Sequence, residues 1–135
     1  MTPRIWWQPE HHRHFVELCV EHKAHLPRMQ HILKPFQQST GTRFTILQLK
    51  DHWGTMLKNW KIWSRLVQCS DMKWNPQTKT FGASDQDWTN YLQVNRKAAK
   101  FRWRNIPHAE KLATIFRHIK VSNPGMLNPV LIAGQ

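Results

Sequence analysis

The sequence is poor in the residues that most catalytic and metal sites require. Among its 135 residues there are only eight Asp and Glu and only two cysteines. The few carboxylates form no obvious acid and base pair, and the chain contains no glycine-rich phosphate loop, nucleophile elbow or metal triad. We therefore predict that this protein is not an enzyme, needs no cofactor and takes no small-molecule substrate.

The two cysteines predict neither a disulfide framework nor a metal site. Cys19 and Cys69 each lie on the apolar side of a predicted helix, which is typical of free buried thiols in a reducing compartment. Cys19 is followed by His22, His25 and His31, but this spacing matches no established zinc motif and crosses a proline. We expect no bound metal.

Long hydrophobic runs are also absent. No stretch approaches the ~18 consecutive apolar residues of a membrane span, and no segment pairs a basic face with a lipid-like apolar face. The first residues lack the apolar run of a signal peptide. We expect no membrane association, and of the remaining compartments the basic charge favours the nucleus.

Positive charge is what the chain has in excess. Twenty Lys and Arg give a net charge of +12 and a pI near 10.4. Residues 96–120 alone carry eight basic residues against one acidic residue. Such a balance favours polyanionic partners, either nucleic acid or acidic protein segments. The alternative is a general solubility charge without a specific partner.

One long amphipathic helix is predicted over Thr45–Cys69. Three tryptophans lie at helical spacing within it, and from Leu49 to Val67 the apolar positions alternate in steps of four and three. Thr45 is a suitable N-cap, with Gln48 as its capping-box partner. The opposite, outer face carries polar and charged residues: Lys50, Asp51, Thr55, Lys58, Lys61 and Arg65.

Shorter helices are predicted on both sides of this one. Leu26-Pro27 separates the first two, and Gly41 suits the C-cap of the second. Ser70–Ala83 is expected to be a turn with short extended pieces, followed by Ser84 or Asp85 as a helix cap. The helices predicted in addition to the long one are Pro9–Ala24, Pro27–Thr40, Gln86–Asn95 and His108–Ile119. We predict one all-α domain over residues 5–120 and a flexible tail over 121–135.

The order and spacing of the aromatic motifs resemble the plant Myb/SANT-like domain, a family of plant nuclear proteins and of proteins derived from Harbinger-type transposons. The resemblance covers roughly Ile5–His118. It rests on these motifs: Trp7-x-x-Glu10, Trp53, Trp60 and Trp63, Lys73-Trp74-Asn75-Pro76, Trp88-x-x-Tyr91-Leu92, and Lys100-Phe101-Arg102. The sequence departs from the family pattern at Ser70–Lys73, at Asn75 and at Gly54.

The resemblance implies a helix-turn-helix core with a C-terminal helical extension, in which the long helix is the recognition helix. Double-stranded DNA is then the expected partner, in a module of a transcriptional regulator. The first half of a recognition helix reaches base edges in the major groove, here through Lys50, Asp51, Gly54, Thr55 and Lys58. Lys61 and Arg65 would bind phosphate. The alternative is a solvated helix face.

A second basic cluster follows the fourth helix. Its members are Arg96, Lys97, Lys100, Arg102 and Arg104. It is expected to contact phosphate without reading sequence, or to act as a nuclear-import signal. For Trp103, which lies within this cluster, we favour a place in the core over a stacking role.

Most tryptophans are expected to be structural. Trp6 or Trp63 is the candidate for exposure, and an exposed tryptophan would indicate a protein partner. A SANT-type module that binds a protein partner with an acidic surface is accordingly the alternative function. The tryptophans assigned to the core are Trp7, Trp53, Trp60, Trp74 and Trp88.

Overall fold

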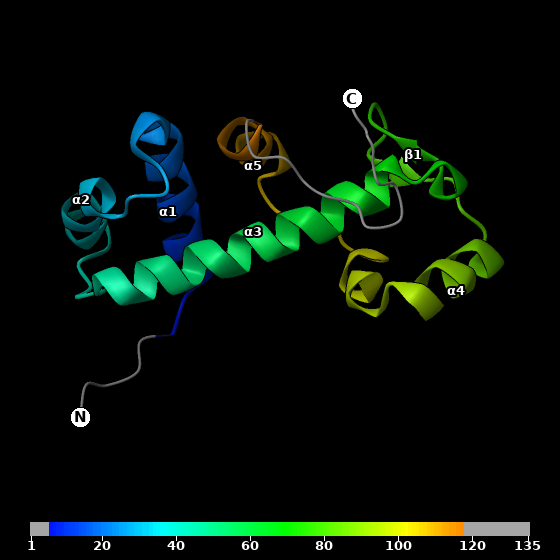
Figure 1. Cartoon of the computed structure of the whole chain (residues 1–135), viewed down its shortest axis with the longest axis horizontal. Coiled ribbons are helices and arrows are strands. Elements are labelled where there is room, and N and C mark those ends of the chain that lie inside the picture. Colours follow the sequence, from blue (N-terminus) through cyan, green and yellow to red (C-terminus); the bar gives the residue numbers. More distant parts are fainter. Residues whose placement is uncertain (1–5, 118–135) are drawn as a thin grey trace. The chain divides into compact units, whose positions relative to one another are not determined.

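The computed structural model describes residues 6–117. This part is mostly helical, with one small antiparallel sheet, and the prediction of an all-α fold is confirmed (Figure 1). The described residues form two compact units, the first of residues 6–57 and 108–117 and the second of residues 58–107. The predicted tail over 121–135 lies outside the described residues. The elements are α1 (Pro9–Glu21), η1 (Lys23–His25), α2 (Gln30–Thr40), α3 (Ile46–Gln68), η2 (Ser70–Met72), β1 (Trp74–Asn75), β2 (Thr80–Phe81), α4 (Asp85–Val94), η3 (Arg96–Phe101) and α5 (Ala109–Phe116).

The first two helices are shorter than the sequence predicts. α1 begins at Pro9, where a missing amide hydrogen costs nothing, but it ends at Glu21 and continues as the short η1. α2 begins at Gln30 rather than at Pro27 and runs through Pro35 without ending there. The connection between the end of α1 and the start of α2, which contains Pro27, is therefore longer than the sequence predicts.

Local capping chemistry defines the end of α2 and the starts of α3 and α4. Gly41 ends α2 with a φ of 64°, a left-handed conformation that suits glycine. Thr45 and Gln48 form the predicted capping box before α3, with Thr45 N donating to Gln48 Oε1 at 2.7 Å and Gln48 N to Thr45 Oγ1 at 3.2 Å. Ser84 and Asp87 form the same arrangement at the start of α4.

The core of the first unit is aromatic at its centre. Phe15 of α1, Phe36 of α2 and Phe44 before α3 are buried, and the half-buried ring of Trp7 packs against all three. This cluster holds the first half of α3 against α1 and α2 (Figure 1). The remaining buried apolar side chains of the unit are Val16, Cys19, Met29, Ile32, Leu49, Met56, Leu112, Ile115 and Phe116.

Trp63 is the centre of the core of the second unit. Its ring is 4% exposed and meets the rings of Trp74, Phe81 and Phe101 edge to face at centroid distances of 5.1, 5.9 and 5.3 Å. Trp74 and Phe81 face each other in the register of β1 and β2. Trp88 of α4 completes the cluster through an edge contact with Phe81 at 5.2 Å.

The burial of the tryptophans agrees with the sequence interpretation for Trp6 and differs from it for Trp103. Of the pair Trp6 and Trp63, Trp6 is the exposed residue at 67%, whereas Trp63 is buried. Trp103, for which we favoured the core, is 83% exposed, so that expectation is wrong. Of the five tryptophans assigned to the core, Trp88 is buried and the half-buried ones are Trp7, Trp53, Trp60 and Trp74.

A pair of half-buried histidines lies inside the first unit. His12 Nδ1 of α1 and His52 Nε2 of α3 are 2.8 Å apart, and the His52 ring stacks on Trp7 at a centroid distance of 3.6 Å. His108, ahead of α5, contacts the His12 ring at 5.6 Å. Burial, with the charge of His12, lowers the pKa of His52 to about 3. Burial, with the charge of His108, lowers the pKa of His12.

We expect this pair to make the free energy of unfolding fall as the pH falls below about 6.5. In that range the unfolded chain takes up protons on His52, whereas the folded chain does so only near pH 3. The linkage relation gives a loss of about 2 kcal/mol from His52 between pH 7 and pH 5. Urea unfolding at the two pH values measures it. His52→Gln is expected to reduce the loss, and the exposed-site control His25→Gln is expected to leave it unchanged; equal losses in both variants would contradict the assignment.

Candidate nucleic-acid interface

The outer face of the first half of α3 is polar and accessible. Lys50, Asp51 and Thr55 are exposed, and Gly54 between them is half-buried. Leu47, one turn earlier, is 63% exposed and is the apolar member of this face. The buried Leu49 and Met56 face the opposite way, into the core. The residues that the sequence assigned to base contacts in this half of the helix are therefore accessible to a ligand.

The turn before α3 adds residues that the sequence interpretation missed. Arg43 is exposed and lines an open groove with Thr42 and Thr45 at the start of the helix. The free amides and the positive end of the dipole at a helix N-terminus favour phosphate. A basic residue three positions before the first residue of α3 was the available signal for this position.

In the second unit, α3 and η3 bring part of the predicted cations together. Arg65 lines a cavity of about 330 Å³ with Arg96 and Lys97. Lys100 Nζ donates to Asn59 Oδ1 of α3 at 2.9 Å. The second half of α3 and the first residues of the basic cluster therefore share one cationic surface, which also includes the exposed Lys58 and the half-buried Lys61.

The end of the basic cluster is separate from that surface. Arg102 is 21% exposed and forms an ion pair with Asp85 of α4, Nη2 to Oδ1 at 2.7 Å. Its guanidinium also lies over the rings of Trp88 and Trp103. Arg102 is thus engaged within the unit, whereas the neighbouring Arg104 is exposed.

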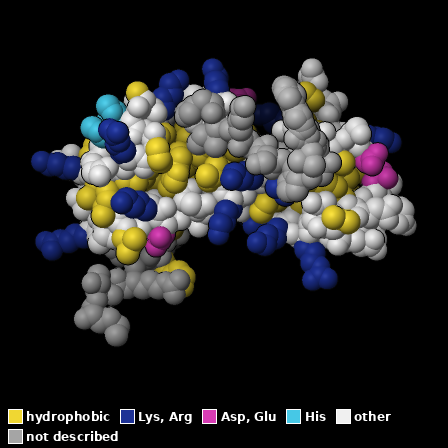
Figure 2. All heavy atoms as spheres, in the orientation of Figure 1, with side chains coloured by type: hydrophobic (Ala, Val, Ile, Leu, Met, Phe, Trp, Pro, Cys, Tyr) yellow, Lys and Arg dark blue, Asp and Glu magenta, His cyan; other side chains and the backbone are white. Residues whose placement is uncertain are grey.

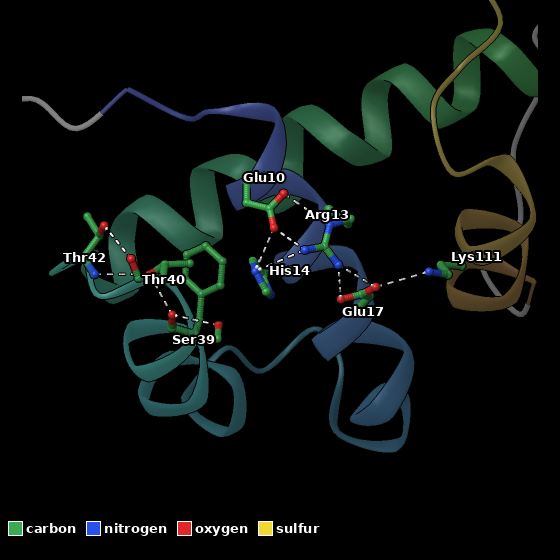
Figure 3. Close-up of polar contacts among 9 residues, drawn as sticks. Glu10, Arg13, His14, Glu17, Ser39, Thr40, Thr42 and Lys111 are labelled. Carbon is green, nitrogen blue, oxygen red and sulfur yellow. Dashed lines mark hydrogen bonds and ion pairs between the residues drawn. The ribbon is translucent and has the colours of Figure 1, made fainter.

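The outer face of α1 contributes little net charge. Arg13 pairs with both Glu10 and Glu17, and Lys111 of α5 reaches Glu17 at 3.5 Å (Figure 3). The hydrogen bond from Arg13 lowers the pKa of Glu10. On the face drawn in Figure 2, Lys and Arg side chains are far more frequent than Asp and Glu. The cationic surface available to a polyanion is therefore supplied by elements other than α1.

The remaining predicted sites behave as follows within residues 6–117. No group of three or more His, Cys, Asp and Glu there is arranged to hold a metal ion. Cys19 is buried, and burial raises the pKa of its thiol. His25 and His31 stack on each other at 3.9 Å, at exposed positions. In the same part of the chain, no helix is both long enough and apolar enough to cross a bilayer.

A comparison with protein families decides the class of this helical arrangement. A family model described as the Myb/SANT-like DNA-binding domain matches residues 6–91, which include α1, α2 and all of α3. The chain belongs to this family. Myb/SANT-like domains are a class of DNA-binding domains and not an enzyme class, so the general prediction of a DNA-binding module is confirmed.

This Myb/SANT-like chain has a relative in Arabidopsis thaliana, an L10-interacting MYB domain-containing protein. The two are 43% identical over 91% of this chain and 30% of the relative. The chain therefore spans less than a third of the length of that relative. No solved structure gives a significant match. The family match ends within α4, so η3 and α5 lie beyond the matched residues.

Gly54 of this Myb/SANT-like domain is not required by the fold. A Cβ atom added there meets no other atom within 4 Å, and helix propensity favours alanine by about 1 kcal/mol. We expect Gly54→Ala to raise the free energy of unfolding by about 1 kcal/mol in urea titrations. Gly41→Ala is the opposite control, because its φ of +64° disfavours a side chain. A Gly54→Ala variant without any gain would contradict this account.

Proposed function

We propose that this Myb/SANT-like domain binds double-stranded DNA in the nucleus, as the sequence-reading module of a transcriptional regulator. The first half of α3 enters the major groove. The observation that carries the proposal is the accessible face of Lys50, Asp51 and Thr55 on a helix whose opposite side is held by an aromatic core. That is the arrangement a recognition helix needs.

The residue types on this face suit base reading. Lysine is a hydrogen-bond donor to the O6 and N7 atoms of guanine, and Asp51 can accept from the N4 amino group of cytosine. Gly54 leaves room for the close approach of a DNA backbone, because no side chain projects there. Thr55 offers both a donor and a methyl group for contact with a base edge.

Phosphate contacts are assigned to the surrounding cations. Arg43 lies at the N-terminus of α3, where the helix dipole supports anion binding. On the second unit the candidates are Lys58, Lys61, Arg65, Arg96, Lys97, Lys100 and Arg104. We rank Arg102 below them, because it is already paired with Asp85. Such contacts give affinity and salt dependence without sequence information.

The test is a selection from a random duplex pool, followed by fluorescence anisotropy on the selected sites across a salt series. We expect the selection to converge on one short motif. The affinity for that motif should exceed the affinity for random duplex by about 1000-fold at physiological salt. Failure to converge, with binding that disappears at modest salt, would reduce the interaction to polycation attraction and exclude the proposal.

A second candidate function is recognition of a protein partner with an acidic surface. Two observations favour it. The Arabidopsis relative is described as L10-interacting, and Trp103 is exposed on the second unit. Exposed tryptophans are enriched among the residues that dominate protein interfaces. The two functions are compatible, because Trp103 lies outside α3 and beyond the residues of the family match.

A further inference from the structure

Trp103 is held in its exposed position by Arg102. The Cζ atom of Arg102 lies 4.6 Å from the Trp103 ring centroid and 5.6 Å from that of the buried Trp88. Asp85 holds the same guanidinium through an ion pair of 2.7 Å. A side chain that is 83% exposed is thus oriented before any ligand arrives, which lowers the entropic cost of binding through it.

A groove of about 450 Å³ lies beside this ring. The aromatic side chains of Phe81, Trp88 and Trp103 line it together with residues of the β-hairpin. Asn105 Nδ2 donates to the carbonyl oxygen of Lys79 at 2.9 Å, which ties the segment after Trp103 to the hairpin. The groove therefore has two connected walls within the second unit, and its volume suits one or two bulky side chains.

The surroundings of the groove are cationic. Lys79 and Arg102 line it, and Arg104 is exposed next to Trp103. Asp85 is the acidic residue of the lining and is paired with Arg102. Because Asp85 neutralises Arg102, the net positive charge around the groove comes from Lys79 and Arg104. Charge complementarity therefore selects an anionic ligand.

We propose that this groove, which we call the Trp103 groove, docks an acidic segment of a partner protein. A bulky apolar side chain of that segment packs against Trp103 and Phe81, and flanking carboxylates pair with Arg104 and Lys79. The proposal rests on the second candidate function, and it supplies the site and the chemistry of the partner. A tryptophan anchor surrounded by arginine is the composition typical of interface hot spots.

Duplex DNA fits this groove less well. Its bases are stacked inside the helix, so it has no apolar group to insert between three aromatic rings, and its outer surface is hydrated phosphate. Single-stranded nucleic acid does expose bases that stack on tryptophan. The single-stranded ligand is therefore the competing outcome that the experiment must separate from an acidic peptide.

The experiment selects binders to the full chain from a library of peptides of about twelve residues, with glutamate-rich flanks and a random centre. A labelled selected peptide is then titrated against the parent chain, Trp103→Ala and Arg104→Glu. We expect enrichment of aromatic or leucine residues at the centre, and a loss of affinity of about tenfold or more in either variant. Trp6→Ala, at the other exposed tryptophan, is the matched control and should stay within about twofold.

Two arms make the outcomes distinct. If no peptide is enriched, or if Trp103→Ala binds the selected peptide as tightly as the parent chain does, the proposal is wrong. It is equally overturned if oligothymidine binds in a Trp103-dependent manner and the peptides do not. Duplex affinity is measured on the same variants, and we expect it to be unchanged in Trp103→Ala. A failure of DNA recognition is thereby separated from a failure of peptide docking.

Discussion

Replacing Lys50 and Lys58 by glutamate is expected to weaken binding to a selected duplex by roughly 100-fold at physiological salt. Both side chains are exposed on α3. Each reversal removes a cationic contact and places a carboxylate against the DNA, and the loss of one good base or phosphate contact costs about 1–3 kcal/mol. Fluorescence anisotropy across a salt series measures the change. The slope of log affinity against log salt should also become shallower.

The matched control for this prediction is Lys23→Glu with Lys34→Glu. These lysines are also exposed, belong to η1 and α2, and produce the same change in net charge. If only the total charge of the chain mattered, both double variants would lose affinity equally, and the assignment of α3 as the reader would fail. We expect the control to lose only a few-fold, and both variants to keep the helical circular dichroism of the parent.

Trp63→Ala is expected to lower the free energy of unfolding by about 3–5 kcal/mol, the range typical for truncation of a buried aromatic side chain. The substitution removes edge-to-face contacts with Trp74, Phe81 and Phe101 at once, and such aromatic pairs each add about 0.5–1.5 kcal/mol beyond area burial. Urea or thermal unfolding followed by far-UV circular dichroism measures the loss.

Trp60→Ala is the comparison that makes this prediction specific. Trp60 lies one turn earlier on α3 and is half-buried, whereas Trp63 is 4% exposed. We expect a clearly smaller loss for Trp60→Ala than for Trp63→Ala. Equal losses would mean that the aromatic cluster of the second unit is not centred on Trp63. They would also mean that the burial of these two tryptophans does not predict how much each one stabilises the fold.

The parts of the fold that follow from local chemistry were predictable from sequence. The apolar steps and the Thr45 cap together predicted a helix over Thr45–Cys69, which is within one residue of α3 at each end. The caps at Gly41, Thr45 and Ser84 depend on side chains within four residues of the helix ends. These signals are short-range, so no tertiary information is needed to read them.

The choice between Trp60 and Trp63 was not predictable in the same way. Both belong to the apolar stripe of α3, so periodicity alone predicts the same burial for both. Trp63 is buried because Phe81 of β2 and Phe101 of η3 pack against it. Those partners lie about 20 and 40 residues further along the chain, so their arrangement depends on the fold of the whole second unit.

The basic cluster shows which part of the candidate site could not be predicted from sequence alone. Read as a run of residues, Arg96 to Arg104 forms one patch. In the structure Arg96 and Lys97 face the cavity beside α3, while Arg102 is held between Asp85 and two tryptophans. Sequence gives the charge but not the partner that neutralises it, because that partner is on α4. The roles of these residues in DNA contact stay predictions.

The two cysteines differ in a way that has a practical consequence. Cys19 is buried within α1, where burial raises the pKa of its thiol, whereas Cys69 is partly accessible directly after α3. Since the thiolate is the reactive species, a maleimide dye added to the native chain will attach preferentially to Cys69. The fold thus provides a natural position for a single spectroscopic reporter in the second unit, without any engineered residue.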